Sequence, residues 1–373
     1  MNESVKKIKL HKYVCKNPFT YIDIQPSNDW ICCPSWCPTS ITQGNTRSRN
    51  EEELPHNSWN SENIKLIRQS VLDGTYQYCK HHICPSLTRL IHTDNVDENF
   101  IEKSQFYHKF NITSLEDISN FKGLPETILF GFDRSCNLKC PSCRLDFVPN
   151  DSVDSAEYQT KLKILNSIET YFSSDVKELI ITGSGDPFYS KIYRDYLINF
   201  KSSLYPNLER INIITNGVLL TEKMWNSLNS KEFIKFIEIS MDAGTKTTYE
   251  EVTRLNGDWD RLIENIKFLS TVSSIKNMVF SMVVSKHNYH EMKTFYDLIS
   301  KIFESSHIQW AIHYRQIVHW GLGAYSIEDI DRLSIFNPQH PEFSKFLFEV
   351  ERVYKLPFVN HNFYNFIRSH LPS

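Results

Sequence analysis

The chain has 373 residues, of which 40% are hydrophobic and 23% charged, a globular composition with room for one large domain or two smaller ones. Its 41 Lys and Arg against 44 Asp and Glu give a net charge of -3, which offers no electrostatic support for binding nucleic acid, RNA modification included, or an anionic membrane. The first residues lack the apolar core of a signal peptide, and no apolar run approaches the about 20 residues of a spanning helix, so a cytoplasmic protein without membrane partners is expected.

The first 95 residues are rich in Cys, Pro and Trp. Alternating apolar and polar residues predict a strand over Tyr21–Gln25. Asn28 and Asp29 predict a turn that leads into a second strand at residues 30–32. A hairpin is therefore expected here.

A helix is expected to follow, with Ser61 as its N-cap. One face of it carries Ile64, Ile67 and Val71, and Gly74 marks its end. This helix delivers the chain to Cys79 and Cys84. Residues from about 95 to 124 are polar and irregular, which predicts a connection over the surface.

From residue 125 short apolar segments alternate with helical periodicity. The predicted strands are Thr127–Phe132, Leu179–Thr182, Ile211–Thr215, Phe236–Met241, Met278–Val284 and Ile308–Ile312. The predicted helices run through residues 158–172, 258–269 and 292–302. Such repeats imply parallel strands with right-handed crossovers, whose ligands gather at the carboxyl ends of the strands. Beyond 321 the aromatic residues predict terminal helices packed on this core.

Nine cysteines occur, at positions 15, 32, 33, 37, 79, 84, 136, 140 and 143. An odd, clustered set without an export signal indicates metals or clusters rather than disulfides. Cys136, Cys140 and Cys143 follow the first predicted strand with C-x3-C-x2-C spacing. Three thiolates hold three irons of a four-iron cluster and leave the fourth iron open to a small molecule. A zinc site completed by His or Asp is the alternative.

This loop and the motifs after it resemble the radical S-adenosylmethionine (SAM) superfamily over roughly residues 125–320. The resemblance implies a [4Fe-4S] cluster on the three cysteines, with SAM on the open iron. Reduction then cleaves SAM to a 5′-deoxyadenosyl radical that abstracts hydrogen from a substrate. The resemblance also implies contacts to SAM from Gly183, Ser184, Gly185, Asp186, Asn216, Ser240, Asp242 and Arg254. Asp186 stands where many relatives have Glu, and Ser142 where a bulky residue commonly precedes the third cysteine.

The N-terminal cysteines resemble the auxiliary-cluster module called SPASM, in its short form called twitch, although that module ordinarily follows the barrel. The resemblance implies a second, fully ligated [4Fe-4S] cluster on Cys15, Cys33, Cys79 and Cys84, for which electron transfer is the preferred role. Cys32 or Cys37 could replace Cys33. A zinc ribbon on the same thiols, with His81 or His82 as further ligands, is the alternative.

The expected architecture is α/β, with a partial (β/α)6 radical SAM barrel between a small cysteine-rich domain and C-terminal helices. The expected parts are an auxiliary-cluster domain (1–95), a linker (96–124), the barrel (125–320) and a helical extension (321–373). The expected reaction modifies a ribosomally made peptide or protein, with flavodoxin or ferredoxin as electron donor. The alternatives are a small molecule such as a sugar, and a non-enzymatic iron-sulfur or zinc protein. Near the end of the sixth strand, the residues that could face substrate or simply lie in the core or on the surface are His313, Tyr314, Arg315 and His319.

Overall fold

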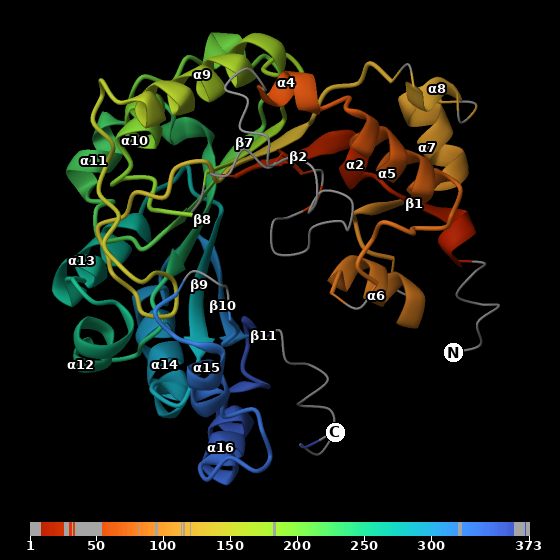
Figure 1. Cartoon of the computed structure of the whole chain (residues 1–373). Helices are drawn as coiled ribbons and strands as arrows, with labels where there is room; N and C mark the ends of the chain where they lie inside the picture. The colour runs from red at the N-terminus through yellow and green to blue at the C-terminus, as the bar shows by residue number, and fades with distance from the viewer. Residues whose placement is uncertain are drawn as a thin grey trace. The chain divides into compact units, whose positions relative to one another are not determined.

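The computed structural model is a mixed α/β structure (Figure 1). It describes residues 9–25, 30–31, 33, 54–81, 83–93, 96–112, 114, 116–119, 121–181, 184–319, 323–361 and 370. The chain divides into two compact units, each assembled from separate segments. Unit 1 comprises Met1–Asp133, Asp151–Ile180 and Lys201–Glu209, and unit 2 comprises Arg134–Asn150, Ile181–Phe200 and Arg210–Ser373.

Unit 1 contains the strands of the N-terminal segment together with the first strands of the predicted α/β region. They are β1 (Tyr13–Cys15), β2 (Tyr21–Ile24), β3 (Trp30–Ile31), β4 (Phe100–Glu102), β5 (Thr127–Phe130) and β6 (Glu178–Ile181), whose last residue belongs to unit 2. β2 pairs with β3 in antiparallel fashion, which confirms the pairing expected of the hairpin, while its turn residues and Cys32 lie outside the described residues. β2 also pairs in parallel with β5, with Tyr21 opposite Thr127. The cysteine-rich segment therefore shares its main-chain hydrogen bonds with β5.

Unit 1 contains the helix predicted after Ser61. Its helices are α2 (Asn17–Thr20), α4 (Pro55–Ser58), α5 (Glu62–Leu72), α6 (Pro85–His92), α7 (Lys103–Phe110), α8 (Glu116–Ser119) and α9 (Ala156–Tyr171). In α5 the predicted face is buried, with Ile64, Ile67 and Val71 at most 4% exposed. Ser61 stands at the N-cap but its side chain makes no capping hydrogen bond. The position of the helix was thus predictable, and its cap contact was not.

The prediction of an irregular connection from about 95 to 124 was wrong. β4 pairs with β1 in antiparallel fashion, and α7 and α8 follow it. Phe106 is fully buried, and its ring centroid lies 4.7 Å from that of Phe19 and 4.5 Å from that of Phe110. Phe106 and Phe110, four positions apart, attach one face of α7 to the core, although the polar and exposed residues between them masked the pattern.

Unit 2 is built on parallel strands with helices between them. Its strands are β7 (Arg210–Thr215), β8 (Ile234–Ser240), β9 (Asn277–Val284), β10 (Gln309–Gln316) and β11 (Val359–His361), each paired in parallel with the next. Its helices are α10 (Lys191–Ile198), α11 (Glu222–Ser227), α12 (Lys246–Thr248), α13 (Trp259–Leu269), α14 (Met292–Ile302), α15 (Ile327–Leu333) and α16 (Phe343–Val353). This confirms the predicted alternation of strands and helices; β11 was not predicted.

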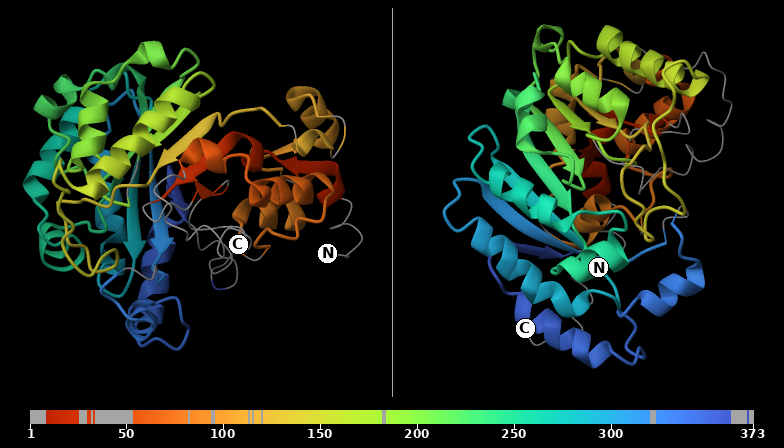
Figure 2. Two further views of the ribbon diagram at one scale, coloured as in Figure 1. Left: turned by 45° about the horizontal axis from the view of Figure 1, so that its top comes forward. Right: turned by 90° about the vertical axis from the view of Figure 1, so that its left-hand side faces the viewer.

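The two faces of the unit 2 sheet differ in chemistry because side chains alternate along each strand. Ile237, Phe280 and Tyr314 are buried on one face, and the Tyr314 hydroxyl donates to the carbonyl of Met292 in α14 at 2.6 Å. Helices α13 and α14 lie on the same side of these strands in both views of Figure 2. The opposite face carries Glu238 and Arg315 among other polar side chains. Ligand chemistry in unit 2 therefore belongs to the polar face and to the loops at the strand ends.

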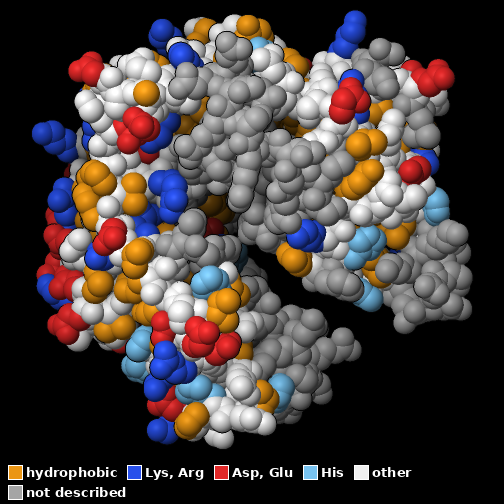
Figure 3. Space-filling view, viewed as in Figure 1, with side chains coloured by type: hydrophobic (Ala, Val, Ile, Leu, Met, Phe, Trp, Pro, Cys, Tyr) orange, Lys and Arg blue, Asp and Glu red, His pale blue; other side chains and the backbone are white. Residues whose placement is uncertain are grey.

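No helix in the described part of the chain combines the length and the hydrophobicity that a membrane-spanning segment requires. On the face shown in Figure 3, Lys and Arg side chains are mixed with Asp and Glu. This mixture agrees with the near-neutral charge of the sequence.

Candidate functional site

The loop after β5 carries the three cysteines in unit 2. Cys136 and Cys140 are 5% and 3% exposed, whereas Cys143 is exposed. The Cys136 amide donates to the carbonyl of Val148 at 3.0 Å, which closes the loop on itself. The amide of Cys143 donates to the carbonyl of Cys140 at 2.9 Å in a tight turn. The loop thus presents its thiols from a backbone that is fixed at both ends.

Each of the three sulfur atoms has an N–H donor of the chain beside it. The Leu138 amide lies 3.4 Å from Cys136 Sγ, and Asn216 Nδ2 lies 3.9 Å from it. Arg254 Nη1 lies 3.4 Å from Cys140 Sγ, and Arg144 Nη2 lies 3.5 Å from Cys143 Sγ. Hydrogen bonds of this kind stabilise thiolates and tune the clusters that thiolates hold.

Arg254 is held in place by Asp242. Arg254 Nη2 lies 2.7 Å from Asp242 Oδ2, and Asp242 Oδ1 accepts from the Val283 amide at 2.7 Å. Arg254 follows a π-helical turn over Tyr249–Thr253, an irregularity frequent at functional sites. The Lys139 amide donates to the carbonyl of Leu255 at 3.0 Å, so the same segment also fixes the cysteine loop.

Asp242 itself departs from the geometry expected from sequence. β8 ends at Ser240, and Asp242 has φ +58°, in the left-handed region that is costly for a residue other than Gly. Ser240 and Asp242, two positions apart in the sequence, are therefore not both part of one extended strand. Ser240 is half-buried, and its hydroxyl accepts from that of Ser281 at 3.3 Å.

Asp186 is a buried carboxylate that holds the loops around the cysteines together. One oxygen accepts from the Thr215 hydroxyl at 2.7 Å and the Asn216 amide at 2.9 Å. The other accepts from the amides of Phe188 and Tyr189 at 3.0 and 3.3 Å. Burial nevertheless raises its pKa above the usual value, against these hydrogen bonds. Both oxygens are thus engaged within the chain.

Gly185 lies where its segment meets the cysteine loop. A Cβ at Gly185 would lie 2.2 Å from the carbonyl oxygen of Ser135, and the Asp186 amide donates to that same oxygen at 2.9 Å. Only Gly allows this approach. The close contact of Gly185 in the structure is therefore with the backbone of the cysteine loop. Ser184 is half-buried and its carbonyl accepts from Arg144 Nη2 at 3.1 Å; Gly183 lies outside the described residues.

The turn after β7 brings Asn216 to the same loop. Asn216 Nδ2 donates to Asn137 Oδ1 at 2.9 Å, and Asn216 Oδ1 accepts from the Val218 amide at 3.1 Å. Gly217 has φ +79°, which the turn requires. The predicted SAM-contacting residues that contact the cysteine loop are Ser184, Gly185, Asp186, Asn216 and Arg254. Asp242 reaches the loop through Arg254.

The donor set fits an iron-sulfur cluster. Among the described residues no three His, Cys, Asp or Glu side chains converge on one point that could hold a single metal ion; in a four-iron cluster each thiolate binds a different iron. Burial, together with the Asp186 charge, raises the pKa of Cys136 to about 12, and burial raises that of Cys140. Such thiols need a cation beside them to deprotonate. The loop is lined by N–H groups that can donate hydrogen bonds to the sulfurs of a cluster; they belong to Arg144, Arg254 and Asn216.

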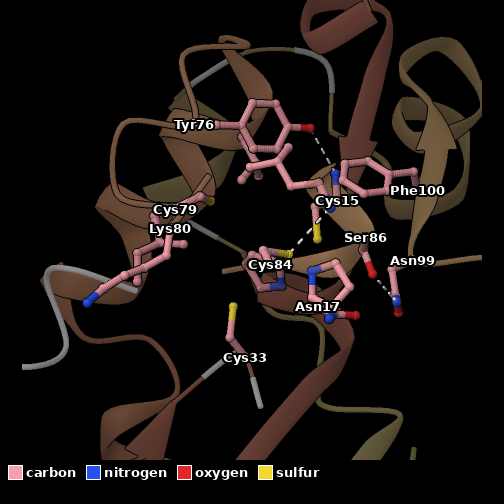
Figure 4. A pocket seen from close by; sticks show the side chains of 15 residues that line it. Cys15, Asn17, Cys33, Tyr76, Cys79, Lys80, Cys84, Ser86, Asn99 and Phe100 are labelled. Atoms are coloured by element: carbon pink, nitrogen blue, oxygen red, sulfur yellow. Dashed lines mark hydrogen bonds between the residues drawn. The ribbon is translucent and has the colours of Figure 1, made fainter. Parts of the chain in front are cut away.

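Unit 1 holds a second cysteine cluster. Cys15, Cys33, Cys79 and Cys84, the four positions derived from the sequence, line one pocket (Figure 4). They come from the end of β1, the segment after β3, the loop after α5 and the N-cap of α6. The cavity volume is about 100 Å³, several times what one water needs.

The lining of this pocket is mainly apolar. It includes Ile67, Val71, Tyr76, Leu87 and Phe100. Tyr76, which is 1% exposed with φ +49°, accepts from the Cys15 amide at 3.2 Å and donates to the Tyr13 carbonyl at 2.7 Å. A strained buried residue that fixes one of the four cysteines marks this pocket as a built site. His81 Nε2 lies 3.1 Å from the Tyr76 carbonyl; Cys32, Cys37 and His82 lie outside the described residues.

Sequence reasoning missed two parts of the site. Arg144 directly follows the third cysteine, is 5% exposed and also donates to the carbonyl of Arg134 at 3.1 Å. Its position next to Cys143 was the feature of the sequence from which this role could have been predicted. The chain after β10 also returns to the cysteine loop, where the Ala324 amide donates to the carbonyl of Pro141 at 2.8 Å. No local pattern announces such a long-range contact.

The predicted substrate-facing residues within β10 lie on different faces of the sheet, because side chains alternate along a strand. His313 and Arg315 lie on the polar face of β10, where Arg315 Nη2 is 2.8 Å from Glu238 Oε1 in β8. His313 Nε2 lies 3.2 Å from Asn360 Nδ2 in β11. Tyr314 is buried on the opposite face, as its core reading predicted, and His319 is exposed.

Comparison with known proteins places the cysteine loop in a recognised domain. Residues 132–299 match the sequence model of the Radical SAM superfamily. No curated protein sequence matches the chain. A solved structure described as "Structure of TYW1 with a lysine-pyruvate adduct bound" is similar at 15% identity, over 58% of this chain and 70% of that chain, with a TM-score of 0.36, too low to support an inference. Residues 132–299 thus form a radical SAM domain, and the protein is a radical SAM enzyme.

Proposed function

We propose that this enzyme abstracts hydrogen from a ribosomally synthesised peptide or protein and that it uses two [4Fe-4S] clusters. The observation that carries the second cluster is the pocket in unit 1, whose lining contains all four cysteines singled out from the sequence. The resemblance of this module to twitch and SPASM modules supports a peptide substrate, because relatives with such modules are associated with peptide maturation.

The radical SAM cluster would be held by Cys136, Cys140 and Cys143. When bound, the cluster and SAM supply an organic radical able to remove an unactivated hydrogen. The chain itself contributes a buried loop, N–H donors beside each sulfur and a closed backbone that limits water at two of the three thiols. The same proposal includes contacts with SAM from Gly183, Ser184, Gly185, Asp186, Asn216, Ser240, Asp242 and Arg254.

The auxiliary cluster would be held by Cys15, Cys33, Cys79 and Cys84, with electron transfer as its role. An apolar lining lowers the local dielectric and favours the low-charge state of a fully thiolate-ligated cluster. The competing occupant of these thiols is zinc, which carries no electron. Iron and zinc content of the purified protein therefore separates the two readings.

Small-molecule chemistry on a sugar is the second candidate, and one observation favours it. The polar face of the unit 2 sheet joins Glu238, Arg315, His313 and Asn360, side chains that suit a ligand with many hydroxyl groups. A polar peptide segment would use the same groups. A flavodoxin or ferredoxin is proposed as the electron donor in either case.

The partial (β/α)6 barrel over 125–320, the cysteine-rich domain over 1–95 and the helical extension over 321–373 are part of this proposal; the segment 96–124, expected as a linker, contains β4, α7 and α8 and is not proposed as one. The parallel β7–β11 sheet with intervening helices supports the barrel. The contributions of Asn99 and Phe100 to the cysteine pocket extend the N-terminal module slightly past residue 95.

Deuterium transfer identifies the substrate class. Anaerobic, reconstituted enzyme with SAM and dithionite is incubated with small-molecule and peptide fractions from host cells grown in D2O, and the 5′-deoxyadenosine formed is analysed by mass spectrometry. A peptide substrate gives deuterated 5′-deoxyadenosine from the peptide fraction, and protease pretreatment abolishes the transfer. Transfer that survives protease but is lost after periodate oxidation would replace the peptide proposal by the sugar one.

A further inference from the structure

The three sulfurs of the cysteine loop are not equivalent in the charge of their donors. Cys136 receives neutral donors, the Leu138 amide and Asn216 Nδ2. Cys140 and Cys143 each receive a guanidinium, from Arg254 at 3.4 Å and from Arg144 at 3.5 Å. Two positive charges therefore lie against two of the three predicted iron ligands.

Both guanidiniums are buried and committed to their positions. The Arg254 side chain is 12% exposed and Arg144 is 5% exposed. Arg144 donates to the carbonyls of Arg134 and Ser184, both at 3.1 Å, and Arg254 is clamped by Asp242. Within the described part of the chain, the buried Nε of neither guanidinium has a hydrogen-bond partner. Both guanidiniums are therefore oriented toward the sulfurs, although this leaves one of their own N–H donors without an acceptor among the described residues.

We infer that Arg144 and Arg254 are positioning residues that raise the reduction potential of the cluster on Cys136, Cys140 and Cys143. This inference rests on the proposed radical SAM cluster. Reduction adds one negative charge to the cluster, and a buried cation beside its thiolates stabilises the reduced form more than the oxidised form. The Asp242 carboxylate behind Arg254 acts in the opposite direction and limits the effect.

The test is a redox titration of the cluster by electron paramagnetic resonance, without SAM, so that affinity for SAM does not enter. Iron content is measured on each sample, and an anaerobic C15A/C33A/C79A/C84A background removes the signal expected from the second cysteine site. In R254Q and in R144Q the reduced-to-oxidised ratio at a fixed solution potential falls at least about tenfold, a downward shift of about 59 mV for a one-electron couple.

D242N separates an electrostatic role from a structural one. It keeps the shape of the Arg254 partner and removes the negative charge, so its potential moves upward, opposite to R254Q. K139Q is the matched control: Lys139 lies between two of the cysteines, but its side chain is 43% exposed and pairs with Asp146 at 3.2 Å, so solvent screens its charge and the potential stays near that of the parent protein.

Three results would overturn the inference. Gln variants with full iron and an unchanged potential would remove the electrostatic effect. Shifts of R254Q and D242N in the same direction would indicate disturbance of the loop. Loss of iron from both Gln variants would make the guanidiniums assembly residues. Absence of any cluster in the parent with intact Cys136, Cys140 and Cys143 would instead contradict the proposed function.

Discussion

Gly185 illustrates at the residue scale how tightly the segment after β6 is fitted to the cysteine loop. Its missing Cβ leaves room for the Ser135 carbonyl, which in turn accepts from the Asp186 amide. The neighbouring Asp186 carboxylate binds the turn after β7. One small residue and one buried acid thus set the spacing between three loops.

Substitution of Gly185 by Ala should destabilise the protein. The new Cβ would lie 2.2 Å from a backbone oxygen that cannot rotate away, so we expect a loss of about 1–3 kcal/mol in the free energy of unfolding, typical of overpacking. Thermal unfolding measures it, with S305A, at an exposed position, as control. An unchanged melting temperature in G185A would show that the loops separate more easily than the structure indicates.

Cys33 is the second prediction at this scale, because the sequence left it in competition with Cys32 and Cys37. Cys33 lines the pocket with Cys15, Cys79 and Cys84. We expect C33A to lose about four irons per chain after anaerobic reconstitution, whereas C37A keeps the iron content of the parent. Full iron in C33A together with loss in C37A would reassign the fourth ligand.

Helix starts show, at the element scale, what local sequence determines. Ser155 precedes α9 and its hydroxyl accepts from the Tyr158 amide at 3.1 Å, a bond that satisfies one of the free donors of the first turn. Ser61 precedes α5 in the same way but makes no such bond. Two serines at the N-cap position therefore differ in how much they contribute to the stability of their helices.

These two caps give a matched pair of substitutions. S155A should lower the free energy of unfolding by about 1 kcal/mol, and S61A should lower it by less, because no capping hydrogen bond is lost. Chemical denaturation of both variants measures the difference. Equal losses would mean that the Ser61 hydroxyl caps α5 in solution.

Periodic elements were predictable because each depends on its own residues. The strands β7 to β10 and the helices α5, α9, α13 and α14 follow directly from apolar spacing. The pairing of β2 with β5 was not predictable, since Tyr21 and Thr127 lie far apart in the chain. Likewise α7 is attached to the core by the contact of Phe106 with Phe19, two residues that no local window of sequence contains together.

At the scale of the whole molecule, the candidate site likewise has a part that was predictable from the sequence and a part that was not. Cysteine spacing predicted the thiol set of unit 2, the resemblance to the twitch module implied the set of unit 1, and motif order predicted Asn216, Asp242 and Arg254. The sequence could not show that Arg254 contacts Cys140, that Asp186 has both oxygens bound within the chain, or that Arg144 lies against Cys143. Those facts arise from loops that meet only in the folded protein.

Each unit carries one cysteine set, so the two sets can be removed independently. The set in unit 2 is proposed to hold the cluster of the radical reaction, and the set in unit 1 is proposed to carry electrons. If both sets hold clusters, the two clusters serve different steps of the reaction. Only the first is required for cleavage of SAM.

The central claim is tested most directly by 5′-deoxyadenosine formation from SAM, with dithionite as reductant, in anaerobic reconstituted protein. The parent protein should form 5′-deoxyadenosine, and C140A should form none, because one of the three cluster ligands is lost. K139Q, with the adjacent charge removed and all three cysteines present, should retain the activity. No 5′-deoxyadenosine from the fully iron-loaded parent, or equal amounts from C140A, would contradict the assignment of these cysteines to radical SAM chemistry.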